Sequence, residues 1–260
     1  MGIFVTAYDK EQCWICGSKD NLTREHKFKA SDIRRHYGRQ NMYVAREVED
    51  GFQSLHAQGP NSKHLKFGSV ICHHCNSTLT QASDRAYDQF AHVVGSESHA
   101  EIACLRAYEY LDKIRESEEY LNLFRYFAKL LGCHLADLGA PIPTHLSKFV
   151  AREIDRNCIW LGVQPDHGYT DMVSRVGSHG PYVAHGGLIV ITKKPKLLPS
   201  RFHSTSTVGP IQFVYYYNLT LRELFEMRVR HPSFIKWCAE YANAAIVNPI
   251  LEEKLKHLGF

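Results

Sequence analysis

The stretch Cys72–Asp84, "CHHCNSTLTQASD", contains two cysteines separated by two residues and followed at once by an asparagine. A second pair with the same spacing, "CWIC", occupies Cys13–Cys16. Two such pairs supply the four sulfur ligands of a tetrahedral structural zinc site, with each sulfur about 2.3 Å from the ion. The spacing therefore predicts a structural Zn²⁺ whose ligands are Cys13, Cys16, Cys72 and Cys75.

The composition of the 260-residue chain is that of an ordinary globular protein, with 44% hydrophobic and 22% charged residues. No apolar run approaches the roughly 20 residues that a transmembrane helix needs, so we expect no membrane contact. The opening "MGIFVTAYDKEQ" lacks the basic start and the long apolar stretch of a secretory signal. We therefore expect a cytoplasmic protein, which favours a metal site over disulfides for the paired cysteines.

Residues 17–71 separate the two cysteine pairs, a gap far longer than the roughly 15–20 residues of a simple zinc finger. The ion must therefore join two elements across an insertion. Soon after the first pair, the turn "SKDN" leads into "LTREHKF", which has the character of a short strand and carries Glu25 and His26 at its centre. The complete order is a cysteine pair, Glu-His, a second cysteine pair and then Asn76.

This order of motifs over Cys13–Phe90 resembles the HNH, or ββα-metal, nuclease superfamily. It is most similar to the zinc-stapled branch, which includes the endonuclease VII-type junction-resolving enzymes of phages and many bacterial HNH proteins. The resemblance implies an α+β fold, with an N-terminal zinc-stapled ββα-metal (HNH) domain over residues 1–98. A mixed helical and β C-terminal region of unknown role would follow over residues 99–260.

The resemblance also implies roles for three residues. In the family pattern, the acidic residue before the histidine and the asparagine after the last cysteine hold a divalent cation, so Glu25 and Asn76 would bind Mg²⁺ or Mn²⁺. Oxygen ligands suit such hard cations, and His26 would act as general base on a water molecule. Successive residues of a strand point to opposite faces, so Glu25 and His26 need a bulge or bend to serve one site. The alternative role for Asn76 is a plain helix N-cap.

Basic residues are dense between Lys19 and Arg39, where there are seven of them against three acidic residues. Phosphate contacts need clustered lysines and arginines. We therefore expect four of them, just downstream of the proposed base, to contact DNA: Lys27, Lys29, Arg34 and Arg35. The alternative is a solvated surface that binds no ligand.

The most specific interpretation is a metal-dependent HNH endonuclease that hydrolyses DNA phosphodiester bonds. Three features depart from the family pattern: Lys29 stands where many relatives carry a proline, only Gly38 is present where they have a Gly-Gly turn, and the insertion from about Ser31 to Lys66 is longer than in the compact resolving enzymes. These departures keep an alternative open, a zinc-dependent nucleic-acid-binding module whose nuclease centre has lapsed. A third alternative is a nuclease-fold scaffold that acts through protein contacts. The sequence leaves RNA as a substrate, and a homodimer, open.

Helix and strand signals follow the second cysteine pair to the end of the chain. Apolar residues from Leu79 to Val93 recur at helical spacing and predict a helix over about 76–94. Residues 99–138 predict two helices that meet near Ser117. Three segments, "NCIWLGV", "GGLIVIT" and "PIQFVYYYN", predict strands, and residues 219–245 return to helix. We recognise no catalytic motif in this region.

Overall fold

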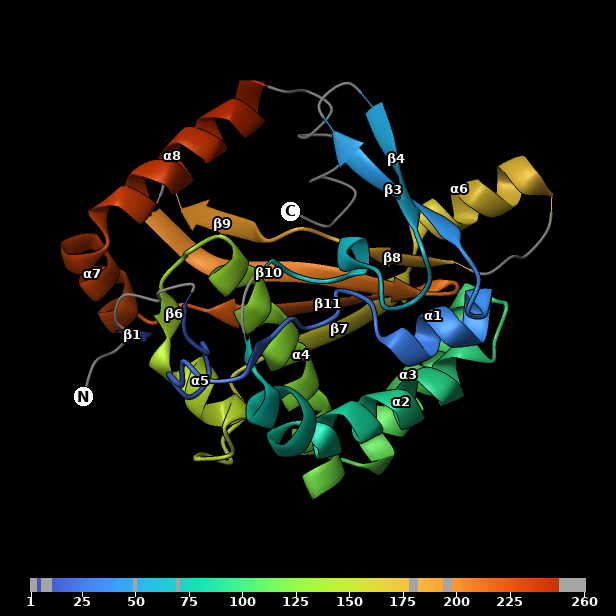
Figure 1. The fold of residues 1–260 in the computed structure, drawn as a ribbon, viewed down its shortest axis with the longest axis horizontal. Helices are drawn as coiled ribbons and strands as arrows, with labels where there is room; N and C mark the ends of the chain where they lie inside the picture. The colour runs from blue at the N-terminus through green and yellow to red at the C-terminus, as the bar shows by residue number, and fades with distance from the viewer. Residues whose placement is uncertain are drawn as a thin grey trace.

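The structure is a computed structural model, and it describes residues 4–5, 11–48, 51–68, 71–177, 182–193 and 198–247. Its fold is mixed α+β, as the sequence predicts, with an antiparallel sheet at the centre and helices packed around it (Figure 1). Within the described residues, no helix combines the length and the apolar character needed to cross a membrane.

The central sheet has the strand order β7-β11-β10-β8, and β8 and β9 pair with successive parts of the same edge of β10. Its strands are β7 (Trp160–Pro165), β8 (Val183–His185), β9 (Ile189–Lys193), β10 (Leu198–Val208) and β11 (Ile211–Asn218). Along β11 the side chains alternate between buried and half-buried positions as far as Tyr217. This alternation is typical of an antiparallel sheet that packs one face on the core. The three predicted strands are confirmed as β7, β9 and β11.

The helices surround the sheet. They are α1 (Ala30–Tyr37), α2 (Gln81–Gly95), α3 (Ala100–Lys113), α4 (Glu118–Asp137), α5 (Thr144–Val150), α6 (His167–Val176), α7 (Leu221–Arg230) and α8 (Pro232–Val247). Helices α1 to α5 precede the sheet in the chain, α6 lies between β7 and β8, and α7 and α8 follow β11. The predicted junction near Ser117 is confirmed, because α3 ends before this residue and its side chain caps α4 by accepting the Tyr120 N–H. The helical prediction for residues 219–245 is confirmed as α7 and α8.

Helix α4 is the central element of the helical layer. Its residues are buried without a break from Asn122 to Ala136, which is the pattern of a helix enclosed on all sides. Tyr126 stacks on Tyr87 of α2 with ring centroids 4.0 Å apart, and Phe127 contacts Phe213 of β11 at 5.6 Å. Helix α4 therefore contacts both α2 and the sheet.

The N-terminal part contains a short antiparallel pair followed by a helix. Strand β2 (Leu22–Thr23) pairs with β5 (Ile71–Cys72), and the chain continues into a π-helical turn, η2 (His74–Leu79), and then α2. The helix predicted over 76–94 is thus confirmed, with its first turn widened. A further short pair joins β1 (Phe4–Val5) to β6 (Ile142–Pro143).

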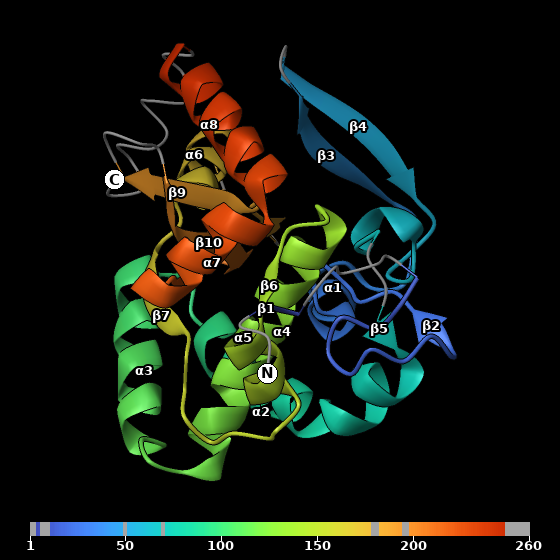
Figure 2. The ribbon, with the colours of Figure 1, turned by 90° about the vertical axis from the view of Figure 1, so that its left-hand side faces the viewer.

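An insertion separates β2 from β5. It contains α1, the hairpin of β3 (Met42–Val48) and β4 (Gly51–Ala57), and the 3₁₀ turn η1 (Lys63–Leu65). The hairpin extends away from the central sheet in both views (Figures 1 and 2). After the hairpin, η1 and β5 lead the chain back to the second cysteine pair.

One cluster of buried side chains extends from Cys13 to Met227, across the boundary expected at residue 98. Trp14, which lies between the first two predicted zinc ligands, is fully buried. Its ring lies against Gly132 of α4, at a position where a Cβ atom would overlap the ring. The cysteine-bearing loop is therefore packed directly on the central helix.

Candidate functional site

The four paired cysteines converge on one point. Their sulfur atoms all lie within 4.8 Å of one another, and those of Cys16 and Cys72 are 3.7 Å apart. Sulfurs bound at about 2.3 Å to one tetrahedral ion are about 3.8 Å apart, so this donor set fits a structural Zn²⁺. The predicted four-cysteine cluster is confirmed. Within the described parts of the chain, it is the group of side chains that lie close enough together to hold a metal ion.

Backbone hydrogen bonds shape both cysteine loops. The Gly17 N–H donates to the Cys13 carbonyl at 2.8 Å, and Gly17 adopts a φ of +76°, which favours glycine. In the second loop the Cys75 N–H donates to the Cys72 sulfur at 3.4 Å. A hydrogen bond from the Cys75 thiol lowers the pKa of Cys13 to about 5. A thiolate at this position is the form that binds a metal.

Glu25 points into the core toward α4. It is buried, and one carboxylate oxygen accepts the backbone N–H of His26 at 3.0 Å. The other oxygen lies 3.1 Å from the ammonium nitrogen of Lys129, which is fully buried. Lys129 follows Glu25 by more than a hundred residues, and local sequence pattern gives no signal for this pair.

Lys129 belongs to a group of five charged side chains that we name the charge cluster: Glu25, Lys29, Asp84, Asp88 and Lys129. One Asp84 oxygen lies 2.9 Å from both ammonium nitrogens, and Lys29 also lies 3.9 Å from Asp88. Burial lowers the pKa of Lys129, but the carboxylates of Glu25 and Asp84 raise it by more, so the net shift is upward. Burial raises the pKa of Asp84, and the two lysines lower it by more. Lys129 and Asp84 are therefore both charged at neutral pH.

His26 lies beyond β2, where the pairing of the strands shifts. Thr23 pairs with Ile71 and His26 with Lys66, so the second strand has two more residues between these pairs than the first. The strand pairing is therefore irregular before His26, and the imidazole forms a hydrogen bond with the Pro60 carbonyl. The carboxylate of Glu25 instead faces Lys129.

The His26 ring is largely withdrawn from water. Its Nε2 atom is buried and has no hydrogen-bond partner within the described part of the chain. Burial lowers the pKa of His26, and the neighbouring Glu25 carboxylate and the Pro60 carbonyl only partly oppose this shift. The imidazole is therefore neutral at pH 7 and can accept a proton.

Asn76 lies within η2, directly after the last cysteine. Its side-chain amide donates to the Thr23 hydroxyl at 3.1 Å, and this hydroxyl donates to the Ile71 carbonyl at 2.8 Å. The N-cap of η2 is His73, so the alternative role of Asn76 as a plain N-cap is wrong. Asn76 is fastened to β2, the strand that leads into Glu25 and His26.

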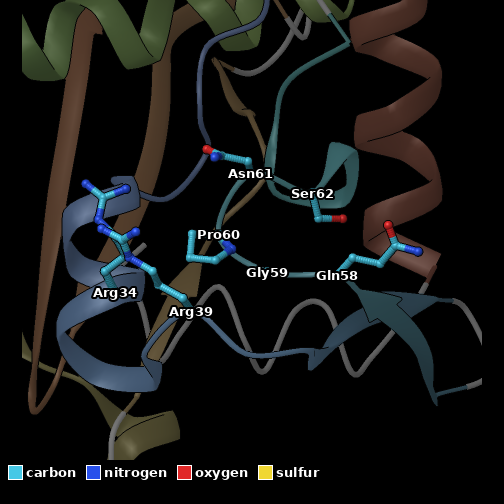
Figure 3. Close-up of a pocket in the computed structure, with 7 residues that line it drawn as sticks. All are labelled: Arg34, Arg39, Gln58, Gly59, Pro60, Asn61 and Ser62. Atoms are coloured by element: carbon cyan, nitrogen blue, oxygen red, sulfur yellow. The ribbon is translucent and has the colours of Figure 1, made fainter.

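The four basic residues predicted to contact DNA have different surroundings. Lys29 belongs to the charge cluster, and Arg35 pairs with the buried Asp32 at 3.0 Å. Lys27 lies 5.8 Å from the centre of the Phe67 ring. Arg34 lines an open cleft of about 580 Å³ (Figure 3).

We name this space the arginine cleft. Its lining residues are Arg34, Arg39, Gln58, Gly59, Pro60, Asn61 and Ser62. Within the described residues, neither Arg34 nor Arg39 forms an ion pair, and the lining contains no acidic side chain. The cleft adjoins His26 through Pro60, which is a contact that sequence reasoning missed.

The sequence matches no family model, and neither the curated proteins nor the solved structures contain a match. The description of this region therefore rests on this chain alone: a four-cysteine cluster, a short β2–β5 pair followed by a helix, and an Asn76 side chain bonded to Thr23 of β2.

Proposed function

We propose that the chain is a metal-dependent endonuclease that hydrolyses DNA phosphodiester bonds. In this proposal His26 is the general base, and Glu25 and Asn76 hold a divalent cation, Mg²⁺ or Mn²⁺. One observation carries the proposal: the four-cysteine cluster joins the loop before β2 to the end of β5 and the start of η2, and Asn76 beside the last cysteine bonds to Thr23 of β2. Asn76 is thereby bonded to the strand that leads into Glu25 and His26.

The state of His26 supports its role as a base. A general base must be unprotonated at the working pH and must have a free nitrogen for the proton. The lowered pKa of His26 and the unpartnered Nε2 meet both requirements among the described residues. The Pro60 carbonyl accepts a hydrogen bond from the ring and so orients it.

The cation ligands follow from the chemistry of Asn76 and Glu25. The Asn76 nitrogen donates to Thr23, which leaves the side-chain oxygen as the atom for a hard cation. Glu25 would share its carboxylate between the cation and Lys129. When bound, such a cation would stabilise the charge on the phosphate and on the leaving oxygen.

The Glu25–Lys129 ion pair also favours a second candidate function. Because Lys129 neutralises Glu25 within the core, the carboxylate already has a cationic partner without any metal. A zinc-dependent nucleic-acid-binding module would need only the cysteine cluster and the surface cations. This module is the alternative to the endonuclease.

The test compares His26→Ala with the parent and with His92→Ala, an exposed histidine on α2. Plasmid nicking is measured in Mg²⁺ and in Mn²⁺, beside zinc content and DNA affinity. Loss of a general base costs about 10²–10⁴ in rate, so His26→Ala should lose cleavage to that extent while it keeps zinc and DNA binding. His92→Ala should cut at the parent rate.

The same assay separates the two candidate functions. Asn76→Ala should lose cleavage at limiting Mg²⁺ and regain part of it at raised Mn²⁺, because it removes a cation ligand and leaves the base. Cleavage by His26→Ala at the parent rate would exclude the assigned base. A parent protein that binds DNA only with zinc and cuts in neither metal is the binding module.

A further inference from the structure

The arginine cleft has the size and the donor groups of an anion-binding site. Its volume of about 580 Å³ lies within the range of about 300–1,000 Å³ that is usual for ligand sites. Figure 3 shows Arg34 and Arg39 on one side of Pro60, with Gln58 and Ser62 on the other. Two guanidinium groups therefore share a concave space with amide and hydroxyl groups that can also donate hydrogen bonds.

Both arginines are available to a ligand. Within the described residues neither has an acidic partner, whereas the adjacent Arg35 is paired with Asp32. A guanidinium group offers a planar fork of donors that matches the oxygens of a phosphate. The lining thus contains two cationic side chains and no acidic one, a combination that favours an anion.

The wall opposite the arginines is a fixed turn. The Ser62 N–H donates to the Gly59 carbonyl at 3.0 Å, and Pro60 occupies the second position, which is favoured in such turns. Gly59 adopts a φ of +130°, and a Cβ atom there would lie 3.2 Å from the Arg39 carbonyl. The turn and the loop after α1 are thus in close backbone contact, which holds this wall of the cleft against the loop that carries Arg39.

The same turn contacts the proposed catalytic base. The Pro60 carbonyl accepts a hydrogen bond from the His26 ring, while the Pro60 ring lines the cleft. An anion held by Arg34 and Arg39 would therefore lie next to the imidazole, separated from it by a single residue. This placement suits a phosphate that neighbours the scissile one along the same strand.

The lining residues indicate which kind of phosphate compound fits the cleft. It contains no aromatic side chain, and bases of single-stranded nucleic acids are usually held by stacking on such side chains. The cleft is suited to the phosphate and sugar, which carry no sequence information. We propose that the arginine cleft is a phosphodiester-binding subsite that seats a polynucleotide strand beside His26. The proposal rests on the endonuclease function for the role of His26, but the subsite can be tested without cleavage.

The experiment measures DNA affinity over a range of salt concentrations, with zinc-loaded protein and no added divalent cation. The variant is Arg34→Gln/Arg39→Gln, and the control is Arg222→Gln/Arg228→Gln, which removes the same charge from exposed positions on α7. Each lost phosphate contact on duplex DNA lowers the log–log salt slope by about 0.9. We expect the first variant to lose about 1.8 from the slope and the control to keep the parent slope.

A competition arm identifies the ligand. A short oligonucleotide should displace labelled DNA from the parent, whereas inorganic phosphate or a mononucleotide at the same phosphate concentration should not. Displacement by the mononucleotide as effective as by the oligonucleotide would overturn the proposal in favour of a nucleotide site. If Arg34→Gln/Arg39→Gln bound DNA with the same salt slope as the parent, the proposal would be overturned outright.

Cleavage measured on the same proteins separates this inference from the proposed function. A reduced slope in a protein that never cuts DNA supports the subsite and removes the endonuclease. Cleavage by the parent that is unaltered in rate and in KM by Arg34→Gln/Arg39→Gln supports the endonuclease and removes the subsite.

Discussion

The charge cluster and the arginine cleft each take a basic side chain from the same short segment, Lys29 and Arg34, yet they use it in opposite ways. Lys29 is largely buried and lies 2.9 Å from Asp84. Arg34, five residues later, is exposed in an open cleft and has no ion pair within the described residues. The density of positive charge in a sequence therefore does not show whether a given charge stabilises the fold or is left for a ligand.

The geometry of α1 explains the difference. At 3.6 residues per turn, positions five apart lie about 140° apart around a helix. Lys29 stands at the N-cap of α1 and faces α2, which carries Asp84 and Asp88. Arg34 lies on another side of α1, toward the turn that follows β4. Helix α1 thus directs Lys29 toward the acidic side chains of α2 and Arg34 toward the open cleft.

Removal of the metal should have the largest effect, because the cysteine cluster supports both regions. Structural zinc contributes about 10–16 kcal/mol in small fingers, which equals or exceeds the total stability of a typical domain, about 5–15 kcal/mol. We expect about one zinc per chain in the parent, and loss of the N-terminal fold together with DNA binding in Cys72→Ser. Elemental analysis, thermal unfolding and limited proteolysis would measure this.

The matched control is Cys158→Ser, which changes a cysteine outside the cluster. It should keep zinc and the protease resistance of the parent. A Cys72→Ser protein that is zinc-free but melts with the parent would show that the charge cluster and the cleft do not depend on the metal.

Lys129→Met should separate the two regions. It leaves Glu25 and Asp84 buried with one cation fewer, and removal of one partner from a buried ion pair costs about 3–5 kcal/mol. The free energy of unfolding should fall by this amount, while the salt slope of DNA binding by the folded protein should stay that of the parent. Denaturant titration and salt-dependent binding supply the two values.

Lys236→Met provides the comparison, since Lys236 is exposed and lies 3.7 Å from Glu240. Exposed pairs contribute about 0–1 kcal/mol, so this variant should unfold almost with the parent. An equally small effect of Lys129→Met would mean that the charge cluster does not stabilise the fold.

Asp32 lies on α1 between the two regions, and its titration gives a smaller effect with a defined sign. Burial raises the pKa of Asp32 from 3.8 to about 6, although Tyr87 and Arg35 partly oppose the shift. The folded state therefore binds the proton more tightly than the unfolded state. The tighter proton binding adds to the free energy of unfolding. This contribution is complete below about pH 4 and is lost as the pH rises through about 6.

Asp32→Asn removes this titration and keeps an acceptor for the Tyr87 hydroxyl, which donates at 2.8 Å. A shift of about two pKa units is worth about 2–3 kcal/mol, so the variant should be more stable than the parent by this amount at pH 7–8. At pH 4 the two proteins should unfold alike. A variant less stable at pH 7 would show that the ion pair with Arg35 outweighs the cost of the buried charge.

The features that sequence analysis predicted well have local signatures. The spacing of Cys13, Cys16, Cys72 and Cys75 predicted their convergence, because each pair forms its own loop. The helix over 76–94 and the junction near Ser117 follow from apolar periodicity and from a capping residue.

The missed features depend on contacts between distant segments. Lys129 reads as an ordinary polar position in a helix, and nothing near it indicates the carboxylate of Glu25. The longest strand of the sheet, β10, was not among the predicted ones. It pairs on both edges, and its run from Ser204 to Thr207 is buried although polar, so it lacks the alternation typical of a strand.

The contact between Trp14 and Gly132 has a consequence for the order of folding. The indole ring belongs to the loop that carries Cys13 and Cys16, and it packs on α4 where Gly132 leaves no space for a Cβ atom. We infer that the ring reaches its final position only after this loop has closed. We expect newly made chains to complete their helical layer after metal uptake. Completion of folding would then depend on the supply of zinc, and chains made without zinc would be more sensitive to cellular proteases.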